Sequence, residues 1–517
     1  MAIKVSGTTV IDDSRNLQNS TNLNATGNVY ANTFIGDGSQ LTNLPPSGGT
    51  ITATASGTLA DGSAVVVNAD GTVSTISGTV YTQSVGSHND FSSPASGTSN
   101  IEFVHGVAYS PDDNKIVLLY SSRSSTALEA VVGTISGTSI SYGTPLTIEG
   151  NKFIIVFSHD NANKGVAVAG TISGTSFSKG TSETFQSSTT VYELSCVYDA
   201  TAERVLVHYT YATNSNYGTL IALAADSGGN ISIAASATLY TSTAISGHGL
   251  SYDSDQGVCV VAYKASNVNY PQYKVVEISG SSFNLGTAVA ESDQQVNTTS
   301  RNGTIAYDAS AQKHLAVWSD TSDKLWFRSL SVSGSSITLG GTAQGDNTRA
   351  DNRYRYATAF YDSFAQLIIF ALLENNNSLN IMPIDMSGSS PSIGTVTTQG
   401  ESVIYTTGMG GAFIGGGQSV FAAREGSGGQ LAAVVFTSPA VETNLTSSNY
   451  LGISNGAYAN NTTATIQVAG AVDDAQSSLT PGQQYFVQAV GSIGTTASSP
   501  SVVAGTAVAA TKLLVKG

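Results

Sequence analysis

The chain has 517 residues and 40% of them are hydrophobic, which is enough for several domains with cores of their own. Only 11% are charged and the formal net charge is −15, so uncharged polar residues supply most of the surface. This composition excludes nucleic acid and anionic membranes as expected partners, because both are bound by clusters of Lys and Arg. The chain has no run of these residues.

The cysteines and the apolar runs exclude further classes. Cys196 and Cys259 lie in apolar runs, where we expect buried free thiols, and two cysteines make no disulfide framework and no zinc site. The longest apolar run, 367–373, is too short to cross a bilayer. The start has no signal-peptide pattern, so we expect synthesis in a cytoplasm without export by the usual route.

Residues 1–50 are predicted to form a β-rich attachment or oligomerisation segment. Their short strands are rich in Asn, Thr and Gly, and the segment is too small and polar to hold a core. We expect residues 1–46 to be stable only when wound around copies of themselves or docked on another protein. Pro45-Pro46 ends this segment as a linker, and residues 51–72 are assigned to a lead-in.

A repeat occupies the middle of the chain. Seven short runs of β-branched and aliphatic residues end in an aromatic residue, with steps of mostly 51 to 55 residues and one of 37. The runs end at Tyr120, Phe157, Tyr209, Tyr263, Trp318, Phe370 and Phe421. Shorter strands that end in an aromatic residue and an Asp precede many of them, as at Asp199, Asp253, Asp308 and Asp362. Four antiparallel strands in a repeat of this length are typical of a β-propeller blade.

A second repeated element, within alternating strand, is Ile, Val or Met followed by Ser-Gly and then by Thr or Ser, which predicts a hairpin turn. It first occurs at 76–78, before the first aromatic run, and no copy follows Phe421. This offset predicts a closed ring in which a strand near Tyr81 pairs with the last blade beside Leu431–Phe436. We therefore predict an all-β protein with a seven-bladed propeller over 73–438 and a small C-terminal β domain over 439–517.

Three stretches resemble virion structural proteins of tailed phages, particularly those that infect cyanobacteria. They are 3–45, 59–73 and the C-terminal module with Leu479-Thr480-Pro481-Gly482-Gln483 and Ala510-Thr511-Lys512-Leu513-Leu514. The resemblance touches both ends and the entrance of the ring, whereas the middle is matched only by its repeat. It implies a tail-fibre-like virion component that is often oligomeric, and it transfers no catalytic residues.

Structural roles explain the residues that could suggest catalysis. The four blade aspartates occupy equivalent places, whereas glycan hydrolysis needs two carboxylates in unlike environments, so we assign them to turn capping. Arg349, Arg353 and Arg355 cluster, and a solvated loop explains them. The six histidines form no metal-ligand spacing. We expect no enzyme activity, no metal and no cofactor.

The expected function is a phage fibre or adhesin subunit located in the virion. Its expected partners are other virion proteins, bound through residues 1–46, further copies in a homotrimer, and a host surface glycan. The alternatives are a phage polysaccharide depolymerase on the same propeller and a secreted lectin-like bacterial propeller. Candidate receptor residues lie in two loops rich in Tyr and Asn, which suit sugars. They are Tyr211, Asn214, Asn216, Tyr217, Asn267, Asn269 and Tyr270.

Overall fold

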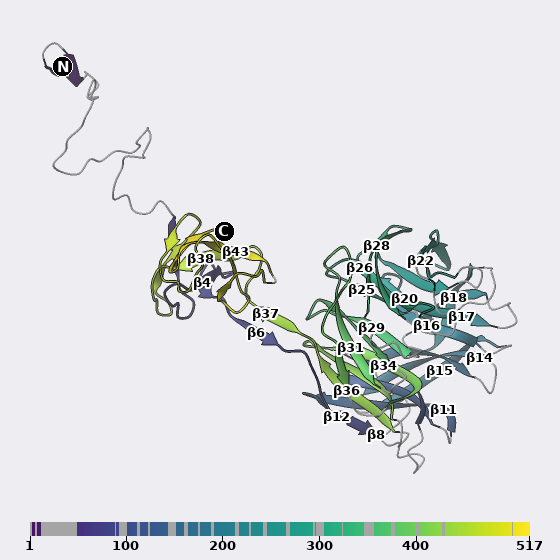
Figure 1. Cartoon of the computed structure of the whole chain (residues 1–517). Helices are drawn as coiled ribbons and strands as arrows, with labels where there is room; N and C mark the ends of the chain where they lie inside the picture. The colour runs from purple at the N-terminus through teal and green to yellow at the C-terminus, as the bar shows by residue number, and fades with distance from the viewer. Residues whose placement is uncertain are drawn as a thin grey trace.

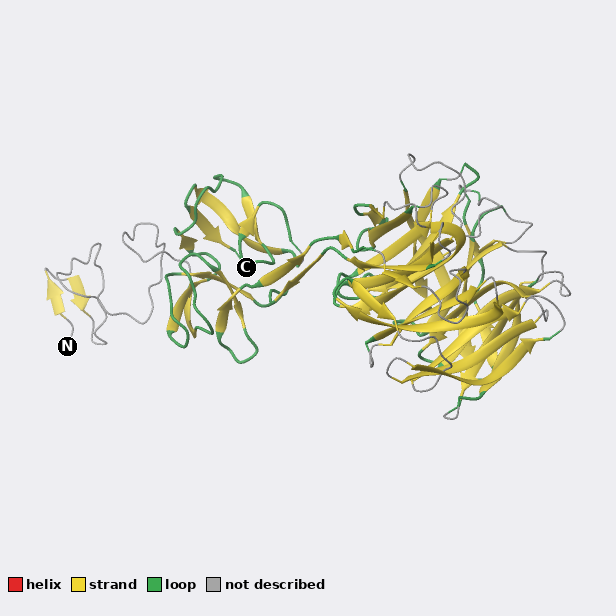
Figure 2. Cartoon of the chain, turned by 90° about the horizontal axis from the view of Figure 1, so that it is seen from below, coloured by secondary structure: helices red, strands yellow, loops and turns green. Residues whose placement is uncertain are grey.

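A computed structural model gives the fold of the chain. It describes residues 3–5, 8–11, 49–87, 89–91, 101–110, 114–122, 125–142, 151–159, 164–173, 176–187, 191–211, 217–226, 229–240, 246–264, 269–292, 295, 304–322, 324–345, 356–373, 378–399, 404–425, 430–498 and 500–516. The described elements are all β-strands, and their pairing is antiparallel throughout (Figures 1 and 2). The expected all-β class is therefore confirmed.

The larger body consists of sheets that follow one another along the chain. The first contains β9 (Ile101–Ser110), β10 (Lys115–Ser122), β11 (Ser125–Ser136) and β12 (Ser139–Tyr142). The second contains β13 (Asn151–His159), β14 (Lys164–Ser173) and β15 (Ser176–Gln186). The third contains β16 (Val191–Asp199), β17 (Arg204–Tyr211), β18 (Gly218–Ala225) and β19 (Ile231–Tyr240). The fourth contains β20 (Ser246–Asp253), β21 (Val258–Lys264), β22 (Gln272–Ser279), β23 (Ser282–Leu285) and β24 (Val289–Ala290).

The remaining sheets of this body continue the pattern. The fifth contains β25 (Thr304–Asp308), β26 (Lys313–Ser319), β27 (Leu325–Ser333) and β28 (Ser336–Gln344). The sixth contains β29 (Tyr356–Asp362), β30 (Leu367–Leu373), β31 (Leu379–Asp385), β32 (Ser392–Ile393) and β33 (Thr397–Gln399). The last contains β34 (Ile404–Gly415), β35 (Gln418–Glu425) and β36 (Leu431–Thr437), together with β7 (Ser84–Val85) and β8 (Asn89–Phe91).

These sheets form a propeller-like ring. β13 lies beside β16, the first strands of the following sheets lie side by side from β16 to β34, and β34 lies beside β9. Between the first and second sheets, β11 contacts β15. The second strands are almost wholly buried, with Tyr120, Phe370 and Phe421 among the largest buried side chains. Alternating burial is lost there because both faces of each sheet pack against a neighbour.

The Ser-Gly hairpins are confirmed in several sheets. Gly137, Gly280 and Gly334 sit between the third and fourth strands at φ values of 60°, 60° and 57°. A side chain disfavours this left-handed conformation, so glycine is the residue that such a turn needs. The first copy of the motif is different, because Gly78 begins a strand, β6 (Gly78–Tyr81), and makes no hairpin turn.

The ring is closed by a segment that precedes the first sheet, but not by the strand expected near Tyr81. β7 pairs with Phe436 and Thr437, and β8 pairs with residues 431–433 of β36. β6 pairs instead with β37 (Ala440–Thr443) in a separate two-stranded ribbon. A strand that precedes the first sheet does complete the last one, as predicted, but it is not the strand that contains Tyr81. The alternation of apolar residues does not show which of two successive short strands pairs with the last sheet.

The second sheet is where the repeat is shortest. Its Ser-Gly motif falls in the sequence between β14 and β15, which pair with each other, so these strands correspond to the third and fourth strands elsewhere. β13, which contains Phe157, then corresponds to a second strand, although it is the first described strand of its sheet. Residues 143–150, which precede it, lie outside the described residues.

The smaller body contains two five-stranded sheets. One orders its strands as β3 (Thr50–Thr54), β39 (Thr463–Gln467), β38 (Tyr450–Ser454), β4 (Ala64–Val67) and β5 (Val73–Thr75). The other orders them as β40 (Val472–Asp473), β44 (Lys512–Val515), β43 (Val502–Ala509), β41 (Gln484–Val487) and β42 (Ile493–Gly494). Residues 51–72, assigned to a separate lead-in, instead share a sheet with residues of the expected C-terminal domain.

The ribbon β6–β37 connects the two bodies (Figure 1). It leaves the ring where Thr437 pairs with Ser84, next to the β34–β35 turn. Tyr81 of the ribbon packs edge-on against Phe364, in the β29–β30 turn, with ring centroids 5.0 Å apart. The ribbon is therefore on the side of the ring where first and second strands are joined. At the N-terminus, β1 (Ile3–Val5) pairs with β2 (Thr8–Ile11). The rest of the predicted segment 1–46 lies outside the described residues.

Candidate binding face and buried carboxylates

The repeated aspartates cap turns, as predicted. One carboxylate oxygen of Asp253, Asp308 and Asp362 accepts hydrogen bonds from the main-chain N–H groups two and three residues later, at 2.9 to 3.0 Å. Asp199 accepts one such bond, from Ala202. All four side chains are buried between the sheets. These carboxylates therefore fix the turns between first and second strands, and they are not open to a substrate.

The second oxygen of each aspartate meets a different partner. Asp199 Oδ2 lies 3.9 Å from Cys259 Sγ, and Asp253 Oδ2 lies 3.2 Å from His314 Nε2, each in the next sheet. Asp308 Oδ2 and Asp362 Oδ2 are buried and have no hydrogen-bond partner among the described residues. The turns are thus equivalent, whereas the contacts between sheets are not.

Ser251, His314 and Asp253 form a connected chain of hydrogen bonds. Ser251 Oγ lies 2.7 Å from His314 Nδ1, and the other ring nitrogen of His314 contacts Asp253. Burial lowers the pKa of His314, although its bond to Asp253 acts in the opposite direction. Burial by itself would raise the pKa of Asp253, but the hydrogen bonds from His314 and the Gln256 N–H turn the net shift downward.

These three residue types are those of a nucleophilic triad, but their setting is that of a structural network. All three side chains are buried between the fourth and fifth sheets. A nucleophile must reach the carbonyl or phosphoryl group that it attacks. A neutral imidazole can accept a hydrogen bond from Ser251 and donate one to Asp253, so that both ring nitrogens have a partner. This buried hydrogen-bond network stabilises the contact between the two sheets.

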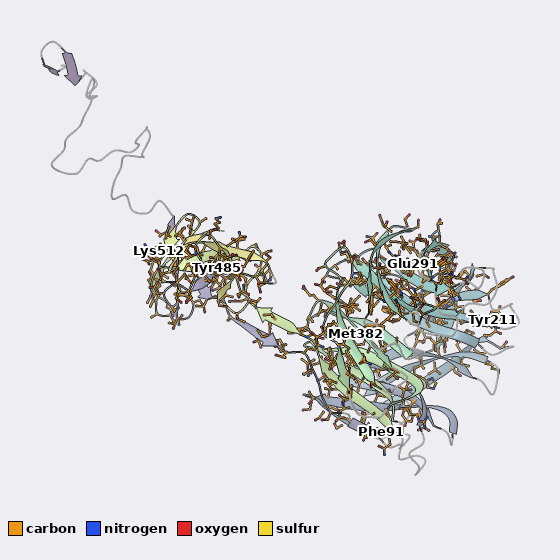
Figure 3. The ribbon with its side chains drawn as sticks, in the orientation of Figure 1. Phe91, Tyr211, Glu291, Met382, Tyr485 and Lys512 are labelled. Carbon is orange, nitrogen blue, oxygen red and sulfur yellow. The ribbon has the colours of Figure 1, made fainter. Side chains whose placement is uncertain are left out.

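A second buried polar cluster joins the same two sheets. Glu291 (Figure 3) accepts a hydrogen bond from Tyr273 Oη at 3.1 Å and from Arg328 Nε at 2.8 Å, and Arg328 Nη2 also donates to it. Arg328 Nη1 donates to the Gly340 carbonyl. The cluster contains one carboxylate paired with one guanidinium, so it lacks the two unlike carboxylates that glycan hydrolysis uses.

The described candidate receptor residues lie next to strand ends, on the side of the ring that is opposite to the ribbon. Tyr211 ends β17 and Tyr217 precedes β18, and both are half-buried. Asn269 is exposed and Tyr270 half-buried just before β22. Tyr211 lies 5.8 Å from Tyr209, between ring centroids. Asn214, Asn216 and Asn267 lie outside the described residues.

The two strand ends belong to adjacent sheets, because β16 contacts β20 and β19 contacts β23. They lie where second strands end and third strands begin, whereas the ribbon leaves from the side of the first turns. Figure 3 shows Tyr211 on the side of the ring remote from the ribbon. The structure thus places this part of the predicted face at the far end of the molecule.

The cysteines follow the prediction only in part. Cys259 is buried as expected, but Cys196 is exposed. It lies on β16, a first strand, where solvent reaches the side chain while surrounding strands still desolvate the thiol and raise its pKa to about 11. Among the described residues, no group of His, Cys, Asp and Glu could hold a metal ion, and no helix is long and apolar enough to span a membrane. Arg349, Arg353 and Arg355 lie outside the described residues.

No protein-family model matches the chain, and no curated protein is similar to it. Solved structures that are similar include a protein from Lactobacillus plantarum, with 12% identity, a TM-score of 0.37, and coverage of 67% of this chain and 100% of that one. A putative 6-phosphogluconolactonase from Bacteroides fragilis has 9% identity and a TM-score of 0.39, covering 59% and 96%. AofleA from Arthrobotrys oligospora has 10% identity and a TM-score of 0.36, covering 66% and 96%. At TM-scores this low, the similarities carry no argument about function.

Proposed function

We propose that the consecutive sheets from β9 to β36 are the blades of a seven-bladed β-propeller. Two observations support this: first strands follow one another around a common centre, and an N-terminal segment completes the last sheet. Such closure removes the free edges of the ring and makes unfolding cooperative across the N- and C-terminal ends of the propeller.

We propose further that the protein is a structural component of a phage particle, a fibre or adhesin subunit. The observation that carries the proposal is the placement of the ring at the end of a two-stranded ribbon, with the Tyr211 face remote from that ribbon (Figure 3). Loops held on such a rigid ring can vary without cost to the core, which suits recognition. The resemblance of both chain ends to virion proteins supports the same function.

In this proposal residues 1–46 join other virion proteins and favour a homotrimer, while the remote face binds a host surface glycan. Tyr211, Tyr217 and Tyr270 offer aromatic faces for apolar sugar surfaces, and Asn269 offers an amide for hydroxyl groups. A mostly uncharged surface would bind with little dependence on salt.

The proposal includes no catalytic activity. The ring aspartates are engaged in turn capping, and Ser251, His314 and Asp253 are buried. No observation on the described residues favours the alternative of a polysaccharide depolymerase.

Purified phage particles provide the test. Mass spectrometry should find this protein in stoichiometric amounts after density-gradient purification, and recombinant protein should compete with the particles for host cells. Absence from the particles would reject the virion role, and failure to compete would reject the adhesin role alone.

A further inference from the structure

The two sheets of the smaller body are copies of one structural module. Each places its strands, numbered within the copy, in the order 1-5-4-2-3. In the first module, which comprises β3–β5, β38 and β39, the ribbon and the ring stand between the third and fourth strands. In the second module, β40–β44, residues 495–501 stand at that place. The propeller-like ring is therefore inserted into a connection of the first module.

The hydrogen-bond register is the same in both copies. Val65 pairs with Gly452 as Tyr485 pairs with Gly505, and a bulge follows in each case. A Cβ at either glycine would lie 2.0 to 2.3 Å from a carbonyl oxygen of the neighbouring strand, so both positions require glycine. The sequences share Leu-x-x-Gly at 59–62 and 479–482, and a Gly nine residues later.

The modules stack through unlike faces. We call front face the side that contains Val65, Val73 and Ile466 in the first module, and Tyr485, Ile493 and Leu513 in the second. The opposite side is the back face, with Ala64, Val66 and Ile453 in the first module, and Gln484, Phe486 and Thr506 in the second. These assignments follow from strand alternation and register.

The back face of the first module packs on the front face of the second. Ala64, Val66 and Ile453 share one core cluster with Tyr485 and Leu513. The front face of the first module has a small core of its own, which includes Val65, Val73 and Ile466. The stacking within one chain is therefore head to tail.

No module packs on the front face of the first module or on the back face of the second. Leu59 and Tyr458 already cover the middle of that front face, so its exposed apolar residues lie at the edge. On the front, Val67 is 36% exposed, whereas its counterpart Val487 is 0% exposed in the stack. On the back, Phe486 is half-buried and Gln484 exposed, whereas their counterparts Val66 and Ala64 are 1% and 2% exposed. Ile51, on the same front face as Val67, is 40% exposed.

We propose that a second copy of this chain covers these faces, with the front face of its first module on the back face of the second module. Inside the chain a back face already packs on a front face, and a second copy would continue the same contact. Because the two contacting surfaces differ, such contacts close into a ring or continue as a filament. This contact is independent of residues 1–46 and of the virion role.

The test uses two full-length variants, Val67→Glu on the free front face and Phe486→Glu on the free back face. The control is Val80→Glu, because Val80 is 61% exposed on the ribbon, away from both faces. Sedimentation equilibrium should give the control the mass of the wild type. Each face variant should lose mass by about twofold or more. Assembly through residues 1–46 is common to the wild type, the control and both variants, so a difference in mass between them reports the face contact.

Mixing the two variants gives the decisive result. Val67→Glu retains a free back face and Phe486→Glu retains a free front face, so the mixture should form a pair with one chain of each. A contact between identical faces would not be restored in this way. Equal masses for the wild type and both variants would overturn the proposal. In that case residues 1–48 or a different partner would cover the faces. If Phe486→Glu melts early, Phe486→Ser replaces it in the same comparison.

Discussion

His314 offers the sharpest test of how the ring is held together. His314 pairs with Tyr307, the residue before the turn aspartate of its sheet. In the next sheet, Ile368 pairs with the equivalent tyrosine, so Ile368 is the counterpart of His314. Replacing His314 by Ile therefore copies a residue that the ring already accepts at that position. The variant removes the bond between His314 and Asp253 Oδ2, and Tyr307 remains as a side-chain partner of the Asp253 carboxylate.

The expected cost follows from the bonds that are lost. The imidazole bonds Ser251 Oγ at 2.7 Å and Asp253 Oδ2 at 3.2 Å, and both partners are buried. Each buried group left unpaired costs about 1–3 kcal/mol, and the apolar area of Ile returns about 1 kcal/mol. We expect His314→Ile to lower the free energy of unfolding by about 1–5 kcal/mol near neutral pH.

The cost should shrink as the pH falls. Burial lowers the pKa of folded His314 below 6.5, so below that pH the unfolded chain takes up a proton that the folded chain refuses. Wild type therefore loses up to about 1.4 kcal/mol per pH unit between 6.5 and the lowered pKa, and the variant does not. Asp253, whose folded pKa is lowered, stabilises the fold above 3.8, outside this window.

Tryptophan fluorescence during urea denaturation is the assay. The chain has two tryptophans, and Trp318 and Trp326 lie on β26 and β27, in the same sheet as His314. Leu315→Ala is the matched control, because Leu315 is buried on the same strand and carries no titratable group. Its cost should not vary between about pH 7.5 and 5.5. A His314→Ile cost that is near zero, or equally independent of pH, would refute the reasoning.

Other expected outcomes test the remaining parts of the account. Phe91→Ala, in closing strand β8 and 5.1 Å from the Tyr142 ring, should cost about 3–4 kcal/mol in urea denaturation; a cost below about 1 kcal/mol would contradict a closing role. Deleting residues 1–46 should leave the melting temperature of the ring unchanged but remove the protein from particles, and assembly of the truncated chain would disprove the attachment role. Purified protein should release no reducing ends from host polysaccharide, and shortened chains would establish an enzyme. Simultaneous alanine substitutions should reduce adsorption to host cells with little change in melting temperature, and unchanged adsorption would reject the site. The substituted residues are Tyr211, Tyr217 and Tyr270.

Local sequence patterns predicted much of the ring because they encode local geometry. An aspartate after an aromatic strand residue caps a turn wherever it occurs, as at Asp253 and Asp362. Glycine at Gly280 and Gly334 likewise fixes hairpins through backbone conformation alone. The partner of each second carboxylate oxygen depends on which sheet lies alongside, and no spacing in the chain predicts His314 against Asp253.

The module pair was missed for a different reason. Leu59 and Leu479 begin the same turn-and-strand pattern, but about 350 residues of ring separate β5 from β38, so half of the first module resembled a lead-in. The copies share few residues because their faces meet different neighbours. Val66, for example, is buried in the stack where Phe486 is half-buried. Register makes the likeness plain, and a single sequence does not record register.

A density map of the intact particle tests the central proposal most directly. We expect this protein on the particle surface, with the smaller body toward the particle, the ring at the outer end and the Tyr211 face outward. A particle that lacks the protein, or one in which the Tyr211 face is buried against another virion protein, would contradict the proposed adhesin.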